Sequence, residues 1–269
     1  MKELKDLNLC DDFLFKEVMK DEKLVIDFLE MVLDIKGKIK SVKFIETEKT
    51  IDGGYDGKTV RLDVYVMDHE EKVYDIEIQN GKLNNLGKRC RKYQSNIDHD
   101  FLKRGHSYAK LKKRYIIMIC TGDPFGEGLY KYTFSNRCHE KLHVELGDEC
   151  EKIFLNTKGK KGEVSRELKA FLNFVEKSTV QKATEIEDSY VKRLSAKIEQ
   201  IKIDEELGGV FMTLEEKMDE IREEAREEGI EKGIKEKSLE VARAMRYKGY
   251  DISDIIEITK LTKEEIESL

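Results

Sequence analysis

Two neighbouring stretches of the chain, residues 59–67 and 72–79, alternate apolar and polar side chains. Alternation with a period of two is typical of β-strands with one buried face, and so short a connection joins antiparallel neighbours. Directly opposed residues of such a hairpin share a face, so the apolar residues constrain how the two strands pair. The chain is therefore expected to contain an antiparallel hairpin with one continuous apolar face.

The favoured register pairs apolar residues along that face: Leu62 with Ile78, Val64 with Ile76 and Val66 with Tyr74. On the other face Asp63 then opposes Glu77 and Arg61 opposes Gln79, with opposed Cβ atoms roughly 4.5 to 5.5 Å apart. A shifted register would keep the two faces but move the carboxylates to a diagonal. The close pairing of Asp63 with Glu77 is the interpretation that we favour.

Two carboxylates held this close destabilise the strands unless one is protonated or a cation lies between them. Proteins commonly bind Mg²⁺ through one or two carboxylates, a backbone carbonyl and water. Asp63 and Glu77 are therefore candidate metal ligands, and the carbonyl oxygen of Ile78 is a candidate third ligand. The alternative is a solvated face on which Arg61 is the counter-ion.

The rest of the pattern predicts an α/β fold with one mixed sheet, followed by helices. In chain order the expected elements are a helix from Asp11 to near Gly37, a strand at residues 40–48, a turn-rich connection at residues 52–57, the hairpin, a helix at residues 83–103, and strands at residues 115–120, 130–137 and 151–156. The first six elements follow an α-β-β-β-α-β order. We expect this domain to span residues 1–160.

Everything after about residue 163 has a helical pattern. We expect a helical connector at residues 161–212, then a long charged helix and a helical hairpin at residues 213–269. The apolar stripe of the long helix consists of Leu214, Met218, Ile221 and Ala225. Its coiled-coil-like spacing predicts a homodimer, while Gly229 and Gly233 predict a kink or folding against a partner.

Charge is sorted along the chain, which is 39% charged and has one proline, Pro124. Residues 81–114 hold 11 basic side chains but only two acidic ones, Asp98 and Asp100. A basic segment in an acidic protein is able to bind a polyanion such as DNA. The alternative is a solvated helix face.

The first residues are charged and no apolar run approaches 18 residues, so a cytoplasmic protein without membrane spans is expected. The five cysteines form an odd number and no CxxC pair. They are expected to be reduced and mostly buried.

Several short motifs along the chain resemble those of a known family. The matching features are Asp12-Phe13-Leu14-Phe15-Lys16, Leu62-Asp63-Val64, Ile76-Glu77-Ile78-Gln79, Arg89 with Tyr93, Leu102-Lys103-Arg104-Gly105, and Lys248-Gly249-Tyr250 with the segment from Leu261 to Ile266. Their order resembles the PD-(D/E)XK nuclease core, and more narrowly the recombination-promoting nucleases, also called PD-(D/E)XK family transposases. The resemblance implies an endonuclease that hydrolyses DNA with Mg²⁺, or with Mn²⁺ or Ca²⁺, in recombination, mobile-element or genome-defence contexts.

The resemblance also implies roles for the hairpin residues. Asp63 and Glu77 would hold the metal ion, and Gln79 would position the attacking water. The general pattern has lysine where this chain has Gln79. Glutamine offers only hydrogen bonds in place of a positive charge, so Arg61 is a candidate helper. The non-enzymatic alternative is therefore a catalytically weakened nuclease fold that binds DNA or a protein.

The basic helix follows the metal strand directly, where DNA phosphates need positive charge. Its candidate DNA-binding residues are Lys88, Arg89, Arg91 and Lys92, of which Arg89 and Arg91 are the favoured phosphate contacts. Tyr93 lies on the apolar stripe and is expected in the core. Asp12 fits either the opening family motif or a helix N-cap.

A rival motif, HExxH, stands at residues 139–143. On a helix it would supply two zinc ligands and a general base. However, Leu142, Val144 and Leu146 alternate with the period of a strand, and no third ligand motif is evident. Zinc proteolysis is thus a remote alternative, and a structural zinc site from Cys138, His143 and Cys150 lacks a fourth ligand.

Overall fold

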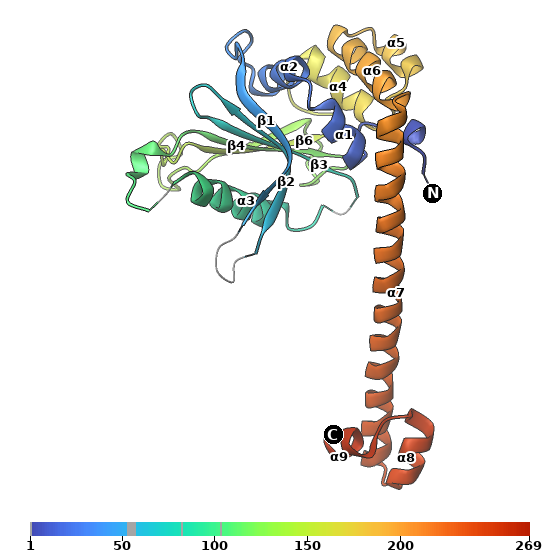
Figure 1. Cartoon of the computed structure of the whole chain (residues 1–269). Coiled ribbons are helices and arrows are strands. Elements are labelled where there is room, and N and C mark those ends of the chain that lie inside the picture. The colour runs from blue at the N-terminus through green and yellow to red at the C-terminus, as the bar shows by residue number, and fades with distance from the viewer. Residues whose placement is uncertain (1, 53–57, 82, 103) are drawn as a thin grey trace. The chain divides into compact units, whose positions relative to one another are not determined.

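A six-stranded mixed sheet forms the centre of the first part of the chain (Figure 1). The computed structural model describes residues 2–52, 58–81, 83–102 and 104–269. The strands are β1 (Val42–Ile51), β2 (Val60–Asp68), β3 (Val73–Gln79), β4 (Arg114–Cys120), β5 (Lys131–Phe134) and β6 (Cys150–Asn156). Their order is β1-β2-β3-β4-β6-β5, with β3, β4 and β6 parallel and the other neighbours antiparallel. The expected α/β fold with a mixed sheet is confirmed.

The hairpin has the expected register at two of its three apolar pairs. The expected pairing of Leu62 with Ile78 is wrong, because the ladder ends at Val64–Ile76 and Leu62 packs in the core beneath α3. Val64 pairs with Ile76 and Val66 pairs with Tyr74. All four side chains are buried. Most of the turn expected at residues 52–57 lies outside the described residues, as do Lys82 and Lys103 of the basic segment.

Helices cover both faces of the sheet. Figure 1 shows α3 (Leu86–Phe101) on one side and α1 (Asp12–Val18), α2 (Glu22–Leu33) and α4 (Arg166–Val175) on the other. The apolar stripe of α3 has the predicted spacing and packs onto the sheet through Leu86, Cys90, Tyr93 and Ile97. Burial of such a stripe stabilises the fold by roughly 25 cal/mol per Å² of apolar surface removed from water. Because α3 packs against Tyr65, Met67 and Val73, the face of the hairpin opposite α1 and α2 is largely covered rather than solvated.

The single helix expected at the N-terminus is wrong, because the chain forms α1 and α2 instead. Met19 leaves the helical conformation, and the side chain of Asp21 accepts a hydrogen bond from the N–H of Leu24. Asp21 thereby caps a new helix that an unbroken apolar period had concealed. The break lets α1 and α2 pack separately, α1 against β2 and α2 against β1.

The chain divides into two compact units, Lys2–Gly208 and Gly209–Leu269. Helices α4, α5 (Val180–Ile186) and α6 (Ser189–Lys202) belong to the first unit, as does the short 3₁₀ helix η2 (Tyr108–Lys110). A second 3₁₀ helix, η1 (Leu4–Asp6), precedes α1. The expected boundary at residue 160 therefore does not separate the compact units, because α6 packs against α1 and α2.

The second unit contains most of α7 (Glu205–Tyr247), followed by α8 (Ile252–Thr259) and α9 (Lys263–Glu267). The capping box expected from Thr262 and Glu265 is confirmed. Helix α7 runs without a break through Gly229 and Gly233, so neither glycine ends it. Ala242, Ile255, Leu261 and Ile266 form a small core where α8 and α9 fold against α7.

The described cysteines are free thiols, of which Cys90, Cys120 and Cys150 are buried. Among the described helices, none combines the length and apolar character that crossing a membrane requires.

Candidate functional site

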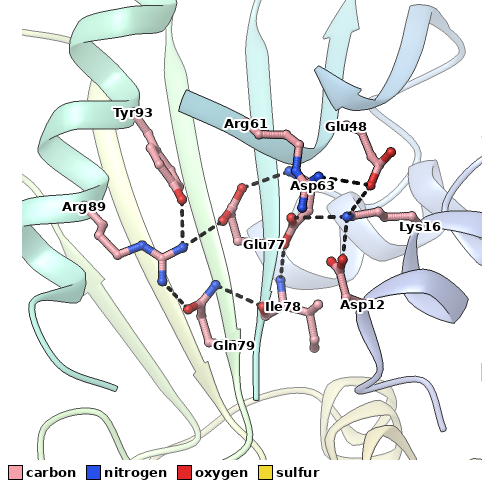
Figure 2. A network of polar contacts seen from close by, with 10 residues as sticks. All are labelled: Asp12, Lys16, Glu48, Arg61, Asp63, Glu77, Ile78, Gln79, Arg89 and Tyr93. Atoms are coloured by element: carbon pink, nitrogen blue, oxygen red, sulfur yellow. Dashed lines mark hydrogen bonds and ion pairs between the residues drawn. The ribbon is translucent and has the colours of Figure 1, made fainter. Parts of the chain in front are cut away.

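At one end of the hairpin, the hydrogen bonds between the strands run from backbone N–H groups to the side chains of Asp63 and Glu77, here called the acid pair, instead of to backbone carbonyls. The β2–β3 ladder ends at the pair Val64–Ile76. Beyond it, the N–H of Asp63 donates to Glu77 Oε1 over 3.0 Å, and the N–H of Ile78 donates to Asp63 Oδ2 over 3.2 Å (Figure 2). The two carboxylates therefore lie together on adjacent strands, as expected, with backbone N–H groups holding their orientation.

Burial makes this acid pair electrostatically costly. Glu77 is 1% exposed. Burial and the charge of Asp63 raise the pKa of Glu77 to about 8. Burial and the charge of Asp12 raise the pKa of Asp63 to about 6. Asp75, fully buried on the same face of β3, has a raised pKa from burial and from Glu77, and neither of its carboxyl oxygens has a hydrogen-bond partner. A cation at the pair would lower this cost.

A network anchored on α3 closes one side of the pair. Arg89 donates to Gln79 Oε1 through one guanidinium nitrogen. Its other terminal nitrogen lies 2.7 Å from the Tyr93 hydroxyl and 3.5 Å from Glu77 Oε2. Gln79 in turn donates to the carbonyl oxygen of Ile78 over 2.9 Å. Arg89 thus stands beside the acid pair, and Tyr93, buried as expected, also orients Arg89.

Lys16 of α1 closes the other side, and its side chain is 5% exposed. Its Nζ lies 2.6 Å from Asp12 Oδ2, 2.9 Å from Glu48 Oε1 and 3.9 Å from Asp63 Oδ1. Burial lowers the pKa of Lys16, but the hydrogen bonds to Asp12 and Glu48 outweigh it and leave that pKa raised. The N-cap interpretation of Asp12 is wrong, because Asp11 occupies that position and Asp12 binds Lys16 instead.

Glu48 reaches this cluster through an unusual backbone conformation. Its φ is +59°, in the left-handed region, within strand β1. Pairing on either side, Thr47 with Val64 and Lys49 with Leu62, places Glu48 opposite Asp63. Such a residue costs about 1 kcal/mol or more and persists only where its surroundings impose it. The sequence analysis gives neither Lys16 nor Glu48 a role. The signals for Lys16 were its i,i+4 spacing from Asp12 and its place in the family motif Asp12-Phe13-Leu14-Phe15-Lys16.

A pocket of about 390 Å³ opens over the acid pair. Its lining residues are Cys10, Asp11, Asp12, Arg61, Asp63, Glu77, Ile78, Gln79, Asn80, Arg89 and Tyr93. Arg61 is exposed and forms an ion pair with Glu48 at 3.8 Å, so it is not the main counter-ion that the solvated-face alternative required. The fold therefore brings together Asp12, Arg61, Asp63, Glu77, Ile78, Gln79, Arg89 and Tyr93.

A second pocket of about 380 Å³ shares Arg61, Arg89 and Tyr93 with the first. Its other lining residues are Lys58, Thr59, Val60, Lys88 and Lys92. Lys88 and Lys92 therefore lie beside the site as expected, and Lys58 is an addition that the sequence did not suggest. Arg91 is exposed on α3 but lines neither pocket.

The donors at the acid pair suit a hard divalent cation. Mg²⁺ is usually bound by one or two carboxylates and a few other oxygens, with water completing its shell. Asp63, Glu77 and the carbonyl oxygen of Ile78 supply such oxygens at one place in the fold. No group of three His, Cys, Asp or Glu residues able to hold a metal occurs in the part of the chain that the structure describes. Two carboxylates and one carbonyl oxygen leave positions for several waters, which fits a hydrated cation such as Mg²⁺.

The HExxH segment does not form the helix that a zinc protease needs. Residues 139–143 lie in an exposed irregular excursion between β5 and β6. The N–H of Cys138 donates to the carbonyl of Val144, and Cys138 Sγ lies 3.1 Å from a Glu140 oxygen. Without helical i,i+4 spacing, His139 and His143 do not share one face, so the zinc-protease alternative loses its support.

A mixed α/β sheet carrying an acid pair on adjacent strands, beside a helix that follows the second of them, defines a fold of the PD-(D/E)XK nuclease class. A family model described as PD-(D/E)XK nuclease family transposase matches residues 9–228. The chain belongs to this family. Comparisons with curated proteins and with solved structures give no match.

Proposed function

We propose that this protein is a metal-dependent DNA endonuclease that hydrolyses phosphodiester bonds in recombination, mobile-element or genome-defence contexts. The observation that carries the proposal is the pair of partly buried Asp63 and buried Glu77. The pair opens into the pocket of about 390 Å³, beside the second pocket, which is lined by basic side chains and is here called the basic groove. Family membership supports a nuclease-type activity.

In this proposal Asp63, Glu77 and the carbonyl oxygen of Ile78 hold Mg²⁺, for which Mn²⁺ or Ca²⁺ are candidate substitutes. A bound divalent ion supplies Lewis-acid charge that activates water and neutralises the scissile phosphate. The backbone N–H groups of Asp63 and Ile78 hold the carboxylates of Glu77 and Asp63, respectively, against the neighbouring strand. The deep burial of Glu77 strengthens its attraction for a cation.

Arg89 supplies the positive charge that the motif lysine would carry. Its guanidinium is bound by Gln79 and Tyr93, so its position is set before substrate arrives. Arginine stays charged and offers several donors, which suits a phosphate that gains charge during hydrolysis. Gln79, whose amide donates to Ile78, is proposed to orient the attacking water and to hold Arg89.

The basic groove is proposed to bind the DNA backbone. Lys58, Arg61, Lys88 and Lys92 line it together with Arg89, which is shared with the acidic pocket. Phosphate contacts of this kind position DNA without reading its sequence. Arg91 lies outside the groove and is proposed only as a peripheral contact.

Homodimerisation through α7 is proposed as well. Leu214, Met218 and Ile221 are exposed along this helix at coiled-coil spacing, and a second copy would bury them.

A plasmid nicking assay tests the proposed activity. Wild-type protein is expected to relax supercoiled DNA with Mg²⁺ or Mn²⁺ and to lose this activity in EDTA. Asp63→Ala is expected to abolish cleavage, whereas the control Glu70→Gln, which changes an exposed carboxylate paired with Lys72, is expected to retain it. Equal traces of cleavage by wild type and Asp63→Ala would favour the alternative suggested by Gln79, a binding module without catalysis.

A further inference from the structure

Lys16 carries a positive charge although its side chain is buried, and burying a charge costs free energy unless the charge is paired. It is surrounded by carboxylates from three elements, Asp12 on α1, Glu48 on β1 and Asp63 on β2 (Figure 2). A buried ammonium is tolerated when it is paired and hydrogen-bonded, and Lys16 has two such bonds shorter than 3 Å. The longer contact, at 3.9 Å, reaches the proposed metal ligand Asp63.

The backbone of Glu48 provides an independent sign that this cluster is maintained. A non-glycine residue with positive φ inside a strand is unusual. Here it stands opposite Asp63 and directs its carboxylate to Lys16. The acid pair therefore lies between two positive side chains, Lys16 beside Asp63 and Arg89 beside Glu77.

We propose that Lys16 is a positioning residue and a resident counter-cation, which shares Asp63 with the divalent ion and weakens the binding of that ion. Its ammonium neutralises the Asp12 and Glu48 side of the site, so that extra negative charge does not repel the DNA phosphate. This inference rests on the metal binding in the proposed function. It assigns Lys16 a role that Gln79 and Arg89 do not fill.

The test is Mn²⁺ binding to the full chain, measured by calorimetry without DNA. Lys16→Met removes the charge and keeps a similar length, while Lys72→Met is the matched control, because Lys72 has its own ion pair with Glu70 in the β2–β3 connection. Removing one positive charge beside a divalent ion is expected to tighten binding about tenfold. Lys72→Met is expected to bind like wild type.

Glu48→Gln gives an expectation of opposite sign. It removes one negative charge from a half-exposed side chain, so the fold is expected to tolerate it. Mn²⁺ is expected to bind a few-fold more weakly, because Lys16 loses a partner and turns more of its charge to Asp63. If Lys16→Met fails to fold by circular dichroism, Glu48→Gln decides the matter.

Unchanged or weaker Mn²⁺ binding by folded Lys16→Met would overturn the inference, since a merely structural lysine supports Asp63 and its loss harms the site. Unchanged binding by Glu48→Gln, or no Mn²⁺ binding by wild type, would overturn it too. Cleavage is measured separately. A wild type that binds Mn²⁺ but never cuts DNA, with the two variants shifted as expected, would refute the proposed nuclease and leave this inference standing.

Discussion

Replacing Glu77 by glutamine is expected to stabilise the metal-free protein at alkaline pH. The carboxyl of Glu77 is buried next to Asp63, and its pKa rises from 4.5 to about 8. A carboxyl with a raised pKa binds its proton more tightly in the folded state. Stability is therefore lost as pH rises from the unfolded pKa to the folded one, and the loss is complete above about pH 8.

The size of the effect follows from that shift. Each pKa unit corresponds to about 1.4 kcal/mol, so the full shift sets an upper limit of about 5 kcal/mol. Asp63 carries part of this cost, because the two carboxylates repel each other and share the benefit when either is neutral. We expect glutamine to recover about 2 to 3 kcal/mol at pH 9 and less than about 1 kcal/mol at pH 5. The amide oxygen is still able to accept from the Asp63 N–H.

Urea unfolding in EDTA at pH 5 and pH 9 measures this difference, with Glu70→Gln as the exposed control. Mg²⁺ at pH 9 is expected to narrow the gap, because a bound cation stabilises only the form with both carboxylates. A Glu77→Gln protein that is no more stable than wild type at pH 9 would refute the argument. So would a stabilisation of equal size at pH 5, since that would have a cause other than charge.

Three further outcomes are expected. Gly159→Ala should lower the free energy of unfolding by about 2 kcal/mol or more, because the added Cβ would lie 2.5 Å from backbone atoms of Tyr130. Gly229→Ala adds a Cβ in open space on a helix and should raise the free energy of unfolding by up to about 1 kcal/mol. Thermal melts of the two variants test this difference. Tyr93→Phe, which frees Arg89, should slow plasmid cleavage about tenfold with little change in melting temperature. Met218→Glu with Ile221→Glu should convert a dimer to a monomer in light scattering, and a wild-type monomer would contradict the proposed dimer.

Local periodicity was sufficient to predict the hairpin. The alternation of apolar residues fixed which residues share a face, and the register favoured among those that it allowed is present at the pairs Val64–Ile76 and Val66–Tyr74. That register alone placed Asp63 beside Glu77. The stripe of α3 and the capping box of α9 were predictable for the same reason, since each depends on neighbours within a few residues.

Features that depend on distant contacts were not predictable. Lys16 looks like a surface lysine in its own helix, and its burial follows from carboxylates 32 and 47 residues away, on β1 and β2. Nothing in the local sequence marks Glu48 as a residue with positive φ. The expected effect of Gly229 and Gly233 failed for a different reason: two glycines weaken a helix without being sufficient to break it, and α7 is continuous.

The position of the positive charges explains how glutamine is compatible with this site. A lysine at position 79 would lie on the same strand face as the buried Glu77 and could satisfy its charge directly, in competition with a divalent ion. In this chain Arg89 is 39% exposed and lies 3.5 Å from Glu77, a distance too long for a strong hydrogen bond. Gln79 holds that guanidinium in the wall of the pocket over the acid pair. The carboxylates thus keep a demand for a cation, while the arginine remains available to a phosphate.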